Sequence, residues 1–158
     1  AVTMPYVVNR WIGGMLTNFS EIRKRIHRLN DLLAQGVSGE LERKYTKKER
    51  VIIGREIEKL NFNFAGIKDM ERLPGLLVIV DPRHDEIAVR EARDLNIPVV
   101  AIVSSDTNIK EVTYPIVAND ALQSSVRALL EEIKDAYVLG KSEYVAPPKK
   151  EEVRTPRA

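Results

Sequence analysis

The feature that most constrains the fold of this chain is a change in the spacing of its apolar residues. From Thr17 to Phe64 apolar residues recur at helical spacing, whereas two later stretches are apolar without interruption. These stretches are Leu76-Leu77-Val78-Ile79-Val80 and Pro98-Val99-Val100-Ala101-Ile102-Val103. Continuous apolar runs of this kind are typical of strands buried on both faces of a parallel sheet. The sequence therefore predicts a helical region followed by an α/β region.

The α/β region alternates predicted strands with predicted helices. A helix between the two apolar stretches is indicated by Ile87, Val89, Ala92 and Leu95. A short third strand follows at Pro115-Ile116-Val117-Ala118, and a last helix carries Leu122, Val126, Leu129, Leu130 and Ile133. This order demands a parallel sheet with right-handed crossovers. Even with Tyr6-Val7-Val8 as a further strand end the sheet is small. Another segment then supplies its neighbours, or the chain is the C-terminal part of a longer protein.

The helical region predicts an antiparallel hairpin. Its two apolar stripes repeat at matching intervals, and they consist of Ile22, Ile26, Leu29 and Leu33, then Ile53, Ile57, Leu60 and Phe64. Stripes this narrow suit a coiled-coil seam, so we expect the hairpin to protrude. The connection from Gly36 to Tyr45 is expected to be a loop. Thr17 or Asn18 is expected to cap the first helix, and Asn18 with Glu21 forms a capping-box pattern. Thr46 with Glu49 forms the same pattern at the start of the second helix.

Charge is distributed unevenly along the chain, although the net charge is only +2. Residues 10–72 contain 14 Lys and Arg against 9 Asp and Glu, whereas residues 73–138 contain 6 against 11. This asymmetry indicates two surfaces with different partners, or else an ordinary solvated helical surface. Cysteine is absent, which excludes disulfides and thiolate chemistry. No apolar run approaches the roughly 20 residues that span a bilayer, so no membrane partner is expected.

The cations of the predicted hairpin are the strongest functional signal. They are Arg23, Lys24, Arg25, Arg28, Arg43, Lys44, Lys47, Lys48 and Arg50. Lysines at a helix start oppose the helix dipole, so the cluster points to an external anionic partner such as a phosphate backbone. Arg10 and Trp11 stand just before the hairpin, next to Gly13-Gly14, and suggest a rigid elbow. Trp11 either stacks on a base or fills a core, and the sequence leaves both open.

Two loops at predicted strand ends carry residues with catalytic potential. Asp81 and His84 follow the first apolar run, and Ser104-Ser105-Asp106-Thr107-Asn108 follow the second. Ligands of open α/β sheets bind at this edge, so a nucleotide-binding enzyme is one hypothesis. Ordinary turn and capping chemistry explains the same residues. The sequence contains no glycine-rich phosphate motif, serine elbow or paired-histidine zinc motif, so no cofactor or metal is expected. A third hypothesis is an adaptor protein whose hairpin dimerises as a coiled coil.

Four motifs follow one another between about Tyr6 and about Gly140. They are Arg10-Trp11-Ile12-Gly13-Gly14-Met15-Leu16-Thr17-Asn18, Gly66-Ile67-Lys68-Asp69-Met70 with Leu73-Pro74, Val80-Asp81 with His84, and Asn96-Ile97-Pro98-Val99 with Ala101-Ile102-Val103. In this order they resemble the bacterial-type family of small-subunit ribosomal protein S2. The family's upstream strands are absent here, Glu71-Arg72 replaces a usual Gly-Gly, and the loop after Val103 carries extra residues.

The resemblance implies a structural protein without enzymatic activity. Its implied fold is a Rossmann-like or flavodoxin-like α/β sheet flanked by helices, with a protruding antiparallel coiled-coil hairpin. Family members bind small-subunit ribosomal RNA and neighbouring ribosomal proteins, including the large messenger-binding protein S1. RNA contacts are therefore expected from Arg10, Trp11 and the hairpin cations. The implied location is the ribosome in the cytoplasm, with an organellar ribosome as the alternative.

These expectations divide the chain into four parts. Residues 1–16 form a strand end and the elbow of the α/β domain, and residues 17–65 form the hairpin. Residues 66–140 complete the α/β domain, and residues 141–158 form a disordered tail. The tail is expected because Pro147-Pro148-Lys149-Lys150 and the residues after it show no apolar period.

Overall fold

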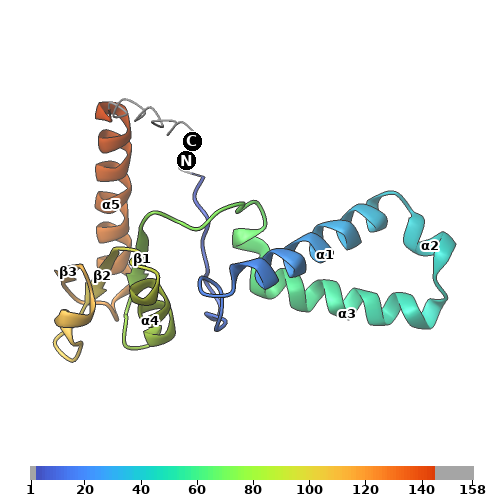
Figure 1. The fold of residues 1–158 in the computed structure, drawn as a ribbon, viewed down its shortest axis with the longest axis horizontal. Helices are drawn as coiled ribbons and strands as arrows, with labels where there is room; N and C mark the ends of the chain where they lie inside the picture. Colours follow the sequence, from blue (N-terminus) through green and yellow to red (C-terminus); the bar gives the residue numbers. More distant parts are fainter. Residues whose placement is uncertain (1–2, 145–158) are drawn as a thin grey trace, which may run out of the picture.

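The computed structural model describes residues 3–144 and divides between an α/β body and a projecting helical hairpin (Figure 1). The strands are β1 (Leu77–Val80), β2 (Val99–Val103) and β3 (Tyr114–Val117). They form a parallel sheet in the order β1-β2-β3, with Leu77 opposite Val99 and Val100 opposite Tyr114. The parallel α/β architecture predicted from the apolar runs is therefore confirmed.

Helix α4 (Glu86–Asp94) connects β1 to β2 and covers one face of the sheet. Its buried Ala88, Val89 and Ala92 pack with strand residues of that face. The cluster, called the body core below, consists of Leu16, Ile79, Ala88, Val89, Ala92, Val99, Ala101, Val103 and Val112. Ile87 and Leu95, which the sequence also placed on the apolar side of this helix, are exposed. The helix buries mainly small side chains, which allows it to approach the sheet closely.

Strand β1 is less buried than its continuous apolar sequence predicts. Ile79 is buried, but Val78 on the opposite face is 39% exposed and the preceding Leu76 is 44% exposed. Within residues 3–144, β1 pairs only with β2 and therefore forms an edge of the sheet. A strand with one neighbour and one covered face leaves alternate side chains in solvent, which explains the difference.

The predicted strand end at Tyr6-Val7-Val8 is wrong, because these residues belong to no strand. The backbone N–H of Tyr6 instead donates to the carbonyl oxygen of Gly66 at 3.0 Å. A Cβ atom on Gly66 would lie 2.1 Å from the Tyr6 carbonyl oxygen, so the two backbones meet at a position where only glycine fits. The N-terminal segment thus lies against the turn that leaves the hairpin rather than extending the sheet.

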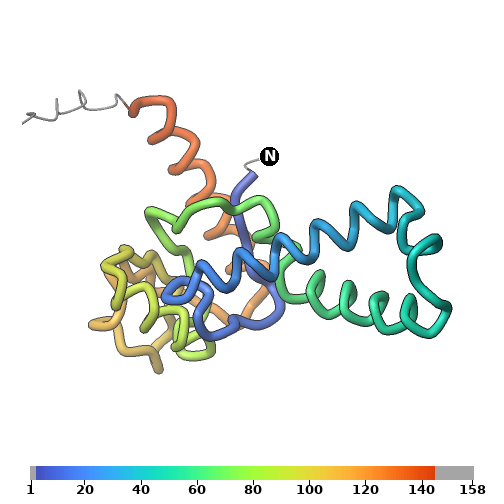
Figure 2. Tube along the Cα trace, turned by 45° about the vertical axis from the view of Figure 1, so that its right-hand side comes forward, coloured from blue at the N-terminus to red at the C-terminus, as the bar shows by residue number. Residues whose placement is uncertain are grey.

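The hairpin consists of two long helices joined by a short one. Helix α1 (Phe19–Val37) runs outward, α2 (Glu40–Lys44) lies at the tip, and α3 (Lys47–Phe64) returns beside α1 (Figure 2). The turn after α3 is the 3₁₀ helix η1 (Ala65–Ile67). The prediction of a loop from Gly36 to Tyr45 is wrong at residues 40–44, because these residues form α2. Apart from this turn of helix, the antiparallel arrangement agrees with the prediction.

The two long helices bury their apolar stripes against each other. The cluster, called the hairpin core below, consists of Met15, Ile22, Ile26, Leu29, Phe64 and Ile67. Ile57 and Leu60 of α3 pack against it, so the hairpin needs no helix from a second chain to cover these residues. In the outer part of α1 the buried residue is Leu32, with 0% exposed, whereas the predicted Leu33 is 39% exposed.

The two predicted capping boxes have different outcomes. At α3, the Thr46 side chain accepts from the Glu49 N–H, and the Glu49 carboxylate accepts from the Thr46 N–H at 2.8 Å. At α1 the capping box is absent. The Asn18 N–H donates instead to the carbonyl oxygen of Gly14 at 2.9 Å, and the Glu21 carboxylate pairs with Lys24 at 2.6 Å. The same sequence pattern therefore caps one helix and not the other.

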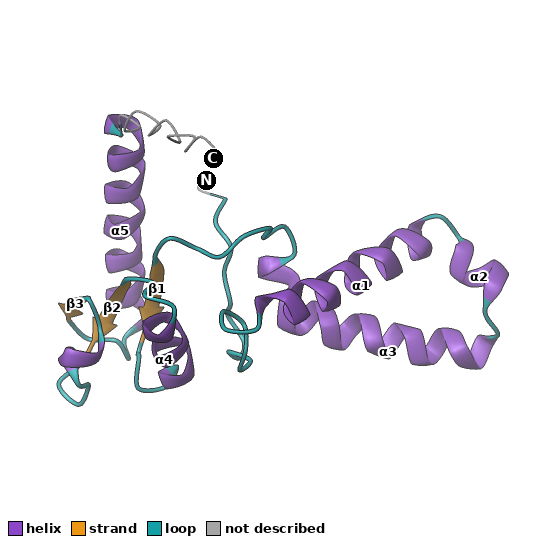
Figure 3. Ribbon diagram, viewed as in Figure 1, coloured by secondary structure: helices purple, strands orange, loops and turns teal. Residues whose placement is uncertain are grey.

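Helix α5 (Gln123–Glu143) begins beside the sheet and rises away from it (Figure 3). It contains no buried residue, and Leu130, Val138 and Leu139 are exposed. The helix continues past the boundary expected at residue 140, while residues 145–158 of the expected tail lie outside the described part. Of the helices in residues 3–144, none is long and apolar enough to cross a membrane.

Candidate nucleic-acid interface

The elbow, residues 10–18, is held by a single carboxylate from the body. Glu91 of α4 accepts the Gly14 N–H at 2.7 Å and the Trp11 indole N–H at 3.3 Å on Oε1. Its Oε2 accepts the backbone N–H of Leu16 at 2.8 Å and of Thr17 at 3.1 Å, and the Thr17 hydroxyl at 3.2 Å. One buried side chain therefore fixes the direction of the backbone immediately before α1.

Glu91 is ionised in this setting despite its burial. Only 6% of the residue is exposed, and burial alone would raise its pKa. The N–H donors of Leu16, Gly14 and Thr17, with the Trp11 indole, outweigh burial and hold the pKa below its ordinary value. Hydrogen bonds to an ionised acceptor are stronger than those between neutral groups, so the contact is a strong one.

The elbow also joins the two cores. Met15 is buried in the hairpin core, whereas its neighbour Leu16 is buried in the body core. Trp11 is half-buried and packs against both clusters. The ring of the only tryptophan therefore lies at the joint between body and hairpin.

The two glycines of the elbow have different roles. Gly14 has φ +90°, a conformation that L side chains rarely adopt, and an added Cβ would lie 3.2 Å from the Asn18 Cβ. Gly13 has open space around its Cβ position. The structure thus explains why glycine stands at position 14, whereas nothing in it explains the glycine at position 13.

Sequence reasoning missed Glu91. Its elbow partners lie 74 to 80 positions away along the chain, and no local pattern connects them. One signal was present: Glu91 stands three positions after Ala88 and next to Ala92, on the apolar side of a short amphipathic helix. A carboxylate there requires hydrogen-bond donors when the helix packs onto a core.

The predicted cations of α1 are exposed and project in several directions. Successive residues of a helix are rotated by about 100°, so Arg23 and Arg25 lie on different flanks. Lys24 pairs with Glu21 at 2.6 Å, and Arg28 bridges to Glu56 of α3 with contacts of 3.1 and 3.3 Å. Arg28 therefore links the two helices, while no ion pair engages Arg23 or Arg25 within residues 3–144.

The predicted cations at the tip are partly engaged. Arg43 donates to the carbonyl oxygens of Ser38 and Gly39, Lys44 pairs with Glu40, and Arg50 lies 3.8 Å from Glu42. These contacts hold α2 and its flanking turns together.

Three predicted cations remain apart from these networks. Lys47 and Lys48, in the first turn of α3, and Arg10, in the elbow, are exposed. In the described part of the chain none of them forms an ion pair with a carboxylate. The predicted cations therefore form no single compact site, and they extend from the elbow to the far end of the hairpin.

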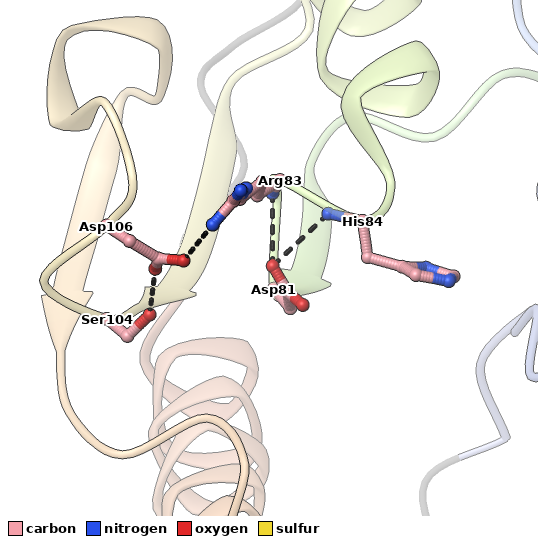
Figure 4. A network of polar contacts seen from close by, with 5 residues as sticks. All are labelled: Asp81, Arg83, His84, Ser104 and Asp106. Atoms are coloured by element: carbon pink, nitrogen blue, oxygen red, sulfur yellow. Dashed lines mark hydrogen bonds and ion pairs between the residues drawn. The ribbon is translucent and has the colours of Figure 1, made fainter.

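The strand-end loops do not assemble a catalytic site. The Asp81 carboxylate accepts the backbone N–H groups of Arg83 and His84 at 3.2 Å, and Asp81 has φ +56° (Figure 4). The His84 ring points away from Asp81, with Nδ1 3.5 Å from the carboxylate of Asp85. Asp81 thus shapes a turn.

The second loop is tied to the first by an ion pair. Arg83 pairs with Asp106, which also accepts from the Ser104 hydroxyl, and these bonds lower the pKa of Asp106. All these groups are partly or largely exposed, and residues 3–144 contain no cluster of three or more metal-binding side chains. The enzyme hypothesis therefore finds no support in the described part of the structure.

Fold and surface together define an α/β protein with a projecting helical hairpin and a scattered set of exposed cations. A family model described as Ribosomal protein S2 matches residues 1–140. The chain belongs to this family, which is structural and not enzymatic and serves translation in the small ribosomal subunit. The resemblance carried by the four sequence motifs is confirmed, and so, at the level of the family, is the absence of enzymatic activity.

Two relatives illustrate the similarity, and both are named Small ribosomal subunit protein uS2. The protein from Acidothermus cellulolyticus is 49% identical over 139 residues, which cover 88% of this chain and 50% of the relative. The protein from Fusobacterium nucleatum is 44% identical over 137 residues, which cover 87% of this chain and 56% of the relative. The chain thus spans about half the length of the curated relatives it matches.

Proposed function

We propose that this chain serves as a structural constituent of the small ribosomal subunit and binds small-subunit ribosomal RNA. Family membership supports the ribosomal part of this proposal. The RNA-binding part is supported by Arg10, Arg23, Arg25, Lys47 and Lys48, exposed cations for which residues 3–144 supply no carboxylate partner. A phosphate backbone supplies many negative charges and binds such cations through counterion release.

The distribution of these cations favours a partner that extends along the hairpin. Arg10 lies in the elbow, and Lys47 and Lys48 lie at the start of α3, at the opposite end of the hairpin (Figure 1). Arg23 and Arg25 lie between them on different flanks of α1. We infer that the hairpin acts as a coiled-coil arm which reaches into RNA and is contacted on more than one side.

The remaining predicted residues take narrower roles in this proposal. Arg28, Arg43, Lys44 and Arg50 stabilise the arm through internal contacts and add to its positive field. Trp11 supports the RNA-binding surface from the joint, because its ring is packed between the two cores. The proposed protein partners are neighbouring small-subunit proteins, including the messenger-binding protein S1, in a cytoplasmic ribosome.

Paired charge reversals test the RNA-binding part. We expect Arg25→Glu with Lys48→Glu to weaken binding to small-subunit ribosomal RNA and to reduce the slope of log K against log salt by about 2. The measurement is fluorescence anisotropy with labelled RNA over a range of salt concentrations, using the whole 158-residue chain.

A matched control separates local contacts from overall charge. Arg93→Glu with Lys110→Glu changes the net charge equally but lies on the body, at exposed positions without an ion pair in the described residues. This variant should keep most of the wild-type salt slope. Equal losses in the two variants, or wild-type binding that does not depend on salt, would show that the hairpin is not the RNA-binding surface.

A further inference from the structure

The buried Glu91 carboxylate accepts five hydrogen bonds. Three backbone N–H groups, one indole N–H and one hydroxyl converge on its two oxygens. All of them belong to the elbow, and α1 begins at Phe19, two positions after Thr17. The contact is therefore the polar link between the body and the base of the hairpin.

We propose that Glu91 is a positioning residue for RNA binding, which sets the direction of the hairpin and of Arg10 without touching RNA itself. The inference rests on the proposed function and names a residue that acts through others. Its basis is geometric: Glu91 binds Gly14, Leu16 and Thr17, and this segment separates Arg10 from the cations of α1. If the segment loosens, the cations on its two sides lose their fixed relative positions.

A glutamine at position 91 would not reproduce this link. Oε1 accepts two donors and Oε2 accepts three, so each position must be an acceptor. A side-chain amide has one oxygen and one NH₂ group, and either orientation would place the NH₂ against N–H donors. Glu91→Gln therefore retains the size of the side chain while removing the acceptor that the elbow requires.

The inference makes a prediction opposite to that of simple electrostatics. Glu91→Gln removes one negative charge, and on charge alone the chain should bind RNA more tightly. If Glu91 positions the hairpin, the variant should instead bind RNA more weakly, by about tenfold in Kd at fixed salt. A matched control is Glu86→Gln on the same helix, which removes the same charge from an exposed residue that pairs with Arg90 and accepts none of the elbow donors. It should bind as tightly as wild type or slightly more tightly.

A second measurement examines the elbow directly and needs no RNA. The amides of Gly14, Leu16 and Thr17 should exchange with deuterium at least about tenfold faster in Glu91→Gln, because they lose their acceptor. In Glu86→Gln their exchange should be unchanged. If Glu91→Gln does not fold, Thr17→Val provides a milder test, since it removes only the hydroxyl donor. That variant should show a smaller loss of RNA affinity in the same direction.

The RNA affinities and the amide exchange rates test the role of Glu91 separately from the proposed function. Faster exchange together with weaker RNA binding in Glu91→Gln supports the inference. Affinity equal to or tighter than that of Glu86→Gln, or unchanged amide exchange, would overturn it. Wild-type RNA binding that is independent of salt would instead contradict the proposed function, and the amide exchange would then still show whether Glu91 holds the elbow.

Discussion

The two adjacent glycines of the elbow differ in the backbone conformation that they must adopt. Gly14 needs φ +90°, whereas Gly13 has no such requirement and has open space around it. We expect Gly14→Ala to lower the free energy of unfolding by about 1–3 kcal/mol, because a Cβ strains this backbone conformation. Urea unfolding of the whole chain measures the change, and Gly13→Ala is the control. Equal effects at both glycines would show that the elbow does not have the described conformation.

The pH dependence of stability should report on Glu91. Its pKa is lowered in the folded chain, so its contribution to stability is present above the ordinary pKa of glutamate. That contribution is lost as the pH falls through the lowered value, because the folded state must then bind a proton. Wild type should therefore be more stable than Glu91→Gln at neutral pH, and the difference should shrink in acid. Unfolding midpoints followed by Trp11 emission measure this, and a difference that stays constant with pH would contradict it.

Glu91 also shows why this site could not be predicted from sequence. Arg10, Trp11 and the hairpin cations stood out because their residue types and clustering are visible locally. The acceptor that orders them comes from another element, with the Leu16 contact spanning 75 positions. Local patterns carry no information on which distant backbone groups a buried carboxylate will meet. Only the packing of α4 against the elbow determines those partners.

At the scale of elements, the two expected capping boxes give a matched prediction. Thr46→Ala should lower the free energy of unfolding by about 1 kcal/mol, since it removes a formed N-cap at α3. Asn18→Ala should lower the free energy of unfolding by only about 0.3 kcal/mol, because the Asn18 side chain makes no cap bond. Urea unfolding measures both variants. A larger loss at Asn18 than at Thr46 would be inconsistent with the capping seen in the structure.

Helices and strands were predictable to the extent that their apolar spacing is local. The stripes of α1 and α3 and the runs of β1 and β2 identified those elements, because helices and strands have different apolar periods that are visible in the local sequence. Helix α2 has only five residues and no apolar stripe, so it gave no signal. The exposure of Val78 was also unpredictable, because it depends on whether another element covers that face of the sheet rather than on the sequence of β1 itself.

At the scale of the whole molecule, the separation of charge matches the separation of parts. The basic residues 10–72 form the elbow and hairpin, and the acidic residues 73–138 form most of the body. This arrangement gives the chain a cationic arm on an anionic base. We expect the arm to meet RNA first, with association slowed by added salt.

The most direct test of a ribosomal role is co-sedimentation of the tagged 158-residue chain with ribosomal subunits from a cell lysate. We predict enrichment with small subunits over large subunits, and release when the salt concentration is raised. The Arg25→Glu, Lys48→Glu variant should be enriched less than the Arg93→Glu, Lys110→Glu variant. Equal distribution between the two subunits, or recovery only in the free protein fraction, would contradict the proposal that this chain is a small-subunit RNA-binding protein.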